Sequence, residues 1–217
     1  MAHVLEPAWR EGPGQLDLEH PPGYANLPLA VIDAIFAIRA NDASARHAVS
    51  RYAERFGVPD VGPEHRDEHE VGLDTLVEQL HGADDDALVS LFCDNQRLAA
   101  RLKAAAVPRA AAALVAVGVT HAADLADPRS EPERADTQEA AWCAVAGCGA
   151  LSWHAVRHSA GLPDVPPETS VVRWVEVATG EETAPDRAGE LLDELATELG
   201  IERPVLDHTI ARSQRQR

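Results

Sequence analysis

The residues from Pro28 to Ile38 constrain the fold more than any other part of the chain. Nearly every side chain in this stretch is apolar, and Asp33 alone interrupts the pattern. A helix that is hydrophobic on all sides must be covered on all sides. The sequence therefore predicts a central helix here, with the other elements of the fold packed around it.

Apolar residues recur at helical spacing in all the other ordered segments, which predicts about ten short helices. Only residues 171–177, VVRWVEV, also fit a strand, and Pro167 and Gly180 bracket a helix equally well. One long alanine-rich segment contains Val107-Pro108, where we expect one helix to stop and another to begin, because proline opens helices but disrupts their interior. The predicted fold class is all-α, with two lobes and no sheet.

The beginning of the chain has a different composition. Residues 1–26 carry four prolines and three glycines with little periodicity, which predicts an irregular N-terminal arm. Residues 27–217 form the predicted helical domain.

The charge of the chain limits its partners. Nineteen basic and 36 acidic residues give a net charge of −17, which disfavours nucleic acids and anionic lipids unless a local patch overrides it. No apolar run approaches the roughly 20 residues that span a bilayer. We expect a cytoplasmic protein that does not bind membranes.

The sequence gives no pattern typical of a metal site or a cofactor. Cys93, Cys143 and Cys148 lack CxxC spacing and are one short of a four-cysteine site. The histidine pairs 65/69 and 154/158 have no third ligand at motif spacing. We therefore expect reduced thiols, no metal and no cofactor.

The most specific motif is a GxG turn between two predicted helices, residues 145–149, called the Gly147 turn below. Its glycines, Gly147 and Gly149, allow positive φ angles and close approach of a partner. The amides that begin the next helix point outward at the positive end of the helix dipole, a geometry that suits a phosphate. A plain tight turn is the alternative interpretation.

The order of three segments resembles the helix-hairpin-helix superfamily of base-excision DNA glycosylases that includes endonuclease III. Residues 146–149 (AGCG) match the family's glycine hairpin, and residues 166–175 (PPETSVVRWV) match the segment with the catalytic carboxylate. Residues 37–42 (AIRAND) match the end of the central helix that faces the minor groove. The order of elements covers roughly residues 26–212, while similarity of individual residues is confined to these segments.

The resemblance implies roles for particular residues. The hairpin residues that would grip the DNA backbone are Gly147, Gly149, Ala150 and Leu151, and Arg39 matches a DNA-facing position. Glu168 matches the catalytic carboxylate. The alternative for Glu168 is a helix N-terminal carboxylate stabilised by the dipole.

Three departures from the family limit the implied chemistry. Leu151 stands where bifunctional members carry the lysine that forms a Schiff base, and the only lysine, Lys103, lies in an earlier helix, so we expect no lyase activity. Glutamate at 168 replaces aspartate and adds one methylene group. The cluster-binding cysteines of many members are also missing.

Two long stretches contain no carboxylate, residues 95–123 and 140–163, and the second contains the Gly147 turn. They are either buried helices or parts of one less acidic face around the turn.

The sequence as a whole suggests two candidate functions. The first is a DNA-binding, glycosylase-like protein that binds duplex DNA and hydrolyses N-glycosidic bonds at most. The alternative is a catalytically inactive helical module with a protein or small-molecule partner.

Overall fold

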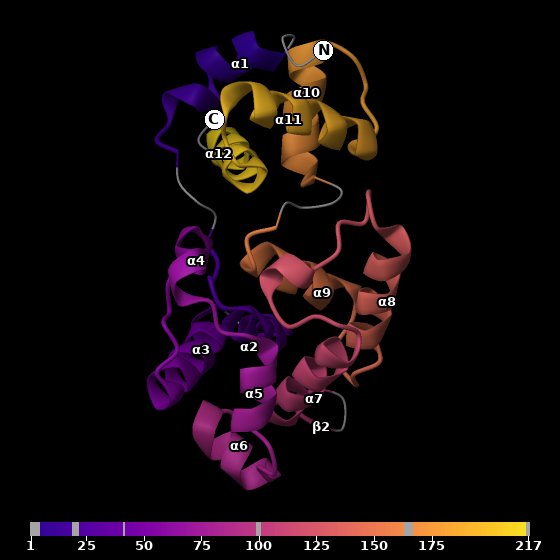
Figure 1. Cartoon of the computed structure of the whole chain (residues 1–217). Coiled ribbons are helices and arrows are strands. Elements are labelled where there is room, and N and C mark those ends of the chain that lie inside the picture. Colours follow the sequence, from indigo (N-terminus) through magenta and orange to yellow (C-terminus); the bar gives the residue numbers. More distant parts are fainter. Residues whose placement is uncertain (1–4, 19–21, 41, 99–100, 163–166, 216–217) are drawn as a thin grey trace. The chain divides into compact units, whose positions relative to one another are not determined.

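The computed structural model describes residues 5–18, 22–40, 42–98, 101–162 and 167–215. In these residues the chain is mostly helical, with 12 α-helices, 67% helix and one two-stranded antiparallel pair (Figure 1). The elements in chain order are α1 (Leu5–Glu11), η2 (Pro13–Gln15), α2 (Leu27–Ala37), α3 (Asp42–Phe56), η3 (Pro63–His65), α4 (Arg66–His69), α5 (Leu73–Gln79), α6 (Asp85–Phe92), β1 (Arg97–Leu98), β2 (Arg101–Leu102), α7 (Lys103–Ala116), η4 (Ala122–Asp124), α8 (Pro132–Cys143), α9 (Ala150–Ser159), α10 (Thr169–Thr179), α11 (Pro185–Leu199) and α12 (Arg203–Arg215).

The chain divides into two compact units. The central unit is Pro22–Gly161, and the terminal unit combines Met1–Pro21 with Leu162–Arg217. Each unit has its own buried side chains, so each is described by itself.

Helix α2 is the core of the central unit, as the sequence predicts. All its residues from Leu27 to Phe36 are buried except Asp33, which is half-buried. Helices α3, α5, α7 and α9 all pack against α2 (Figure 1). The helix begins with Pro28 in its first turn, where the missing N–H costs nothing.

The terminal unit corrects the prediction of an irregular N-terminal arm. Residues 5–11 form α1, and Leu5 and Trp9 are buried with Trp174, Leu192 and other apolar residues of α10, α11 and α12. Leu5 and Trp9 lie four residues apart on one face, and a helix this short gives too little periodicity to be recognised in sequence. Residues 1–4 and 19–21 of the predicted arm lie outside the described residues.

Two local predictions around helix α7 are wrong. The helix runs through Pro108 without a break, because proline removes only the hydrogen bond to the Ala104 carbonyl while the flanking alanines remain buried. Residues 97–102, predicted to be helical, contain β1 and β2 instead. The ambiguous segment 171–177 is helical, within α10.

Both tyrosines of the chain are buried in the central unit, which leads to a prediction about alkaline pH. Burial, with the nearby charge of Asp33, raises the pKa of Tyr24, and burial raises the pKa of Tyr52. In the unfolded chain the tyrosine hydroxyls ionise near pH 10, and in the folded protein they ionise only at higher pH. The free energy of unfolding should therefore fall as the pH rises above 10. The expected loss is up to about 1.4 kcal/mol per pH unit for each tyrosine.

Absorbance titration tests this directly, because the chain has only two tyrosines. The native protein should give almost no tyrosinate signal at about pH 11, whereas the protein in urea should titrate near pH 10. A native midpoint near pH 10 would show that the two hydroxyls are not buried.

Candidate functional site

The Gly147 turn requires glycine at one of its two glycine positions. Gly147 has φ +96°, and a Cβ atom placed on it would lie 2.5 Å from the Cβ of Leu98 in β1. Gly149 has φ −163°, which any residue adopts, and a Cβ there would meet nothing within 4 Å. The turn therefore packs its first glycine against β1 and leaves the second open.

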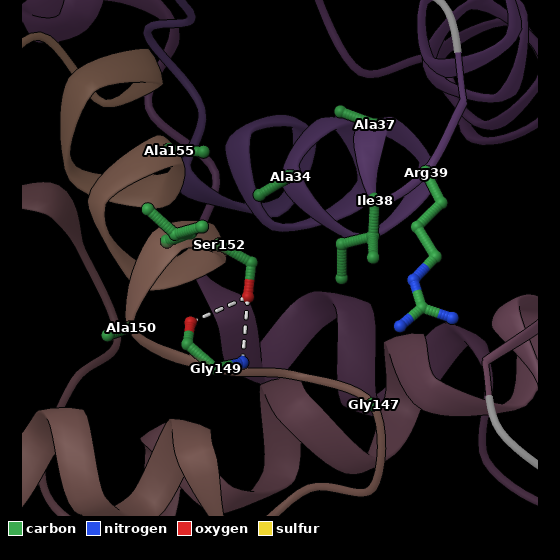
Figure 2. Close-up of a pocket in the computed structure, with 10 residues that line it drawn as sticks. Ala34, Ala37, Ile38, Arg39, Gly147, Gly149, Ala150, Ser152 and Ala155 are labelled. Atoms are coloured by element: carbon green, nitrogen blue, oxygen red, sulfur yellow. Dashed lines mark hydrogen bonds between the residues drawn. The ribbon is translucent and has the colours of Figure 1, made fainter.

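The hydroxyl of Ser152 fixes the beginning of α9. It accepts hydrogen bonds from the Gly149 amide (3.0 Å) and from Nε1 of Trp142 (2.9 Å), and it donates to the Gly149 carbonyl (2.8 Å; Figure 2 shows both bonds to Gly149). These three bonds use the one donor and two acceptors of a hydroxyl. Trp142 belongs to α8 and is fully buried, and Ser152 belongs to α9. Their hydrogen bond therefore joins the two helices on either side of the turn.

The first amides of α9 remain available to a ligand. The Trp153 amide bonds to the Gly149 carbonyl, while an α-helix has no partner for the amides of its first residues, Ala150 and Leu151. Both residues are exposed, Leu151 at 89%. The positive end of the α9 dipole therefore faces solvent at the Gly147 turn.

Arg39 follows the end of α2 and adopts a left-handed conformation, with φ 53°. This conformation costs a residue other than glycine roughly 1–2 kcal/mol. The side chain is exposed, and it extends from the end of α2 toward the Gly147 turn (Figure 2). The backbone strain therefore accompanies a guanidinium directed at the turn.

Lys103 anchors the end of α2. Its Nζ donates to the carbonyl of Phe36 (3.1 Å) and to Oε1 of Gln96 (2.9 Å), and the residue is 1% exposed. Burial lowers the pKa of Lys103, and the charge of Asp94 opposes that shift. The only lysine of the chain therefore joins the end of α2 to Gln96 through buried hydrogen bonds. Its sequence context did not predict this role.

The end of α2, the Gly147 turn and α9 line an open pocket of about 530 Å³ in the central unit (Figure 2). It is lined by all five residues predicted to contact nucleic acid, Arg39, Gly147, Gly149, Ala150 and Leu151, together with Ala34, Ala37, Ile38, Ser152 and Ala155. None of the ten lining residues is acidic. The pocket therefore combines an apolar wall with a guanidinium and the amino end of a helix.

Glu168 belongs to the terminal unit and immediately precedes α10. Its carbonyl accepts hydrogen bonds from the amides of Val171 and Val172, and its Oε1 accepts the Ser170 hydroxyl at 3.1 Å. A side-chain cap would accept hydrogen bonds from the first amides of α10. The Glu168 carboxylate accepts none of them. The side chain is exposed.

The cysteines and histidines form no metal cluster in the described part of the chain. The three cysteines are free thiols. Burial, and to a smaller extent the neighbouring Cys143, raises the pKa of the Cys148 thiol to about 11. This thiol is therefore protonated at neutral pH and is a weak nucleophile.

None of the described helices is both long and apolar enough to cross a membrane.

The chain was compared with family models, curated proteins and solved structures. A family model described as a domain of unknown function (DUF8548) matches residues 5–215. No curated protein and no solved structure matches the chain. The resemblance to DNA glycosylases therefore depends on the three sequence segments alone.

Proposed function

The chain belongs to the family of the domain of unknown function DUF8548, and we propose that its central unit binds the backbone of duplex DNA through the Gly147 turn. The observation that carries this proposal is the common pocket of Arg39, the Gly147 turn and the first residues of α9. A guanidinium and free helix amides are both donors that suit phosphate oxygens.

The distribution of charge supports a local anion site in an acidic protein. The pocket contains no carboxylate, and the stretches 95–123 and 140–163 supply β1, β2, α7, the turn and α9 without an acidic residue. Ala99, Ala100 and Pro163 of these stretches lie outside the described residues. A phosphate at the turn would therefore meet donors first, although the net charge of −17 opposes long-range attraction.

The glycosylase resemblance extends the proposal to a helix-hairpin-helix mode of binding. Helix α8, the Gly147 turn and α9 would be the hairpin unit, with the apolar side of the pocket against the sugar. Leu151, exposed where bifunctional members carry lysine, excludes a Schiff base at that position. The chemistry that remains is hydrolysis of the base–sugar bond without strand cleavage.

Binding to duplexes across a salt series tests the proposal. We expect log K to fall linearly with log salt between about 50 and 200 mM, with a slope of about −0.9 for each phosphate contacted. A duplex with an abasic-site analogue should bind more tightly than an intact one, because its backbone deforms at lower cost. No detectable binding at the lowest salt would contradict the proposal and favour the alternative, an inactive scaffold for a protein partner.

Glu168→Gln tests whether hydrolysis accompanies binding. The exposed carboxylate accepts no hydrogen bond from the first amides of its own helix. Where base release from damaged duplexes is observed, we expect it to fall roughly 10²- to 10⁴-fold in the variant while DNA affinity is retained. Ser170→Ala, which removes the hydroxyl that donates to the carboxylate, is the matched control and should keep most of the activity.

Unchanged base release in Glu168→Gln would rule out this residue as the acid.

A further inference from the structure

The strands β1 and β2 each carry one exposed arginine, and β1 packs against the Gly147 turn through Leu98. In their antiparallel register Leu98 pairs with Arg101, and Arg97 pairs with Leu102. Residues directly opposite each other point to the same face of the pair, with Cβ atoms about 5 Å apart. Arg101 therefore shares a face with Leu98.

Leu98 places that face against the turn. It is 4% exposed, and its side chain fills the space in which a Cβ on Gly147 would lie. Since Arg101 lies next to Leu98 on the same face, its exposed side chain begins beside the Gly147 turn. Arg97 is directed to the opposite face, with Leu102.

Lys103 connects the strand pair to the end of α2. Its amide donates to the Gln96 carbonyl (2.9 Å), and its Nζ joins the Gln96 side chain to the Phe36 carbonyl, three residues before Arg39. One buried side chain thus holds the base of β1 and β2 beside the segment that carries Arg39. A cation at this point is also favourable for the carboxyl end of α2.

Arg39 and Arg101 are both available for a ligand. Within the described residues, neither guanidinium makes a hydrogen bond or an ion pair with the protein. Both come from segments that meet at the Gly147 turn, and neither segment brings a carboxylate into the pocket. A chain of phosphates, with a negative charge at each nucleotide, matches two separated guanidinium groups better than a single phosphate does.

We propose that Arg101 is a second backbone-binding residue, so that Arg101, the α9 amides and Arg39 hold neighbouring phosphates of one DNA strand. This inference rests on the proposed function and deepens it: the ligand is a continuous polyanion, and β1 and β2 are part of the interface. The contacts are to phosphates only, so they carry no base specificity.

The test compares Arg101→Gln with Arg55→Gln over the same salt series. Arg55 is an exposed arginine of α3 whose guanidinium lies 5.6 Å from the ring of Phe56. Arg55 lies about 20 Å along α3 from Asp42, the residue of this helix that is nearest to Arg39 in the sequence. Both variants lose one charge, so any difference between them reports local contact rather than net charge.

We expect Arg101→Gln to reduce the magnitude of the salt slope by about 0.9, equally for unrelated duplex sequences, and Arg55→Gln to leave it nearly unchanged. Arg39→Gln should act like Arg101→Gln, and the double variant should lose about twice as much. Circular dichroism melting of each variant verifies folding, since all three substituted side chains are exposed.

Equal slopes for Arg101→Gln and Arg55→Gln, with a reduced slope for Arg39→Gln, would overturn the role of Arg101 and leave the proposed function intact. A wild-type protein that shows no salt-dependent binding would overturn both.

Discussion

Gly147→Ala should lower the free energy of unfolding by about 2 to 5 kcal/mol. The left-handed backbone at φ +96° costs an alanine roughly 1–2 kcal/mol, and forcing a methyl group against Leu98 costs about 1–3 kcal/mol more. Urea unfolding followed by tryptophan fluorescence measures the change, since Trp142 and Trp153 lie on the two helices that the turn joins.

Gly149→Ala is the matched control in the same turn. Its backbone is extended and its Cβ would meet nothing within 4 Å, so the only expected loss is that of an alanine at a helix N-cap, about 1 kcal/mol or less. An equal loss of stability in the two variants would show that Gly147 does not pack against Leu98 of β1.

Leu151→Glu should weaken DNA binding at least tenfold without destabilising the fold. The side chain is 89% exposed, so the substitution removes almost no packing. A carboxylate in the first turn of α9 stabilises the helix by about 0.3–1 kcal/mol. It also places a like charge where the phosphate is expected, which costs several kcal/mol in a complementary interface.

Val177→Glu provides the control for net charge. Val177 is 75% exposed on α10 in the terminal unit, and the substitution adds the same charge far along the sequence from the Gly147 turn. Fluorescence anisotropy with a labelled duplex measures both affinities. Equal affinities of the two variants would mean that the turn does not contact the phosphate.

The local features of the fold were predictable from the sequence where a single rule decides them. The uninterrupted apolar pattern of α2 predicts its central position, because only a fully covered helix tolerates it. The proline rule failed at Pro108, where burial of the surrounding alanines outweighs one lost hydrogen bond. Helix α1 was missed because Leu5 and Trp9 are identified as core residues only by their partners in α10, α11 and α12.

The candidate site was predictable in part. The family resemblance selected Arg39 and four residues of the turn and α9, and these five line one pocket. The packing of Leu98 against Gly147 and the bonds of Lys103 to Phe36 depend on contacts between segments distant in sequence, which periodicity does not contain. The absence of carboxylates from residues 95–123 was the sequence signal that connected this segment, predicted to be helical, with a less acidic face around the turn.

The most direct measurement of the central proposal is a titration of the isotope-labelled protein with a short duplex, followed by amide NMR shifts. Direct contact of a phosphate with the amino end of α9 predicts that the amides of Ala150 and Leu151 move most, with smaller shifts around Arg39 and no change in α6. Unmoved amides at Ala150 and Leu151 in the presence of saturating duplex would contradict it.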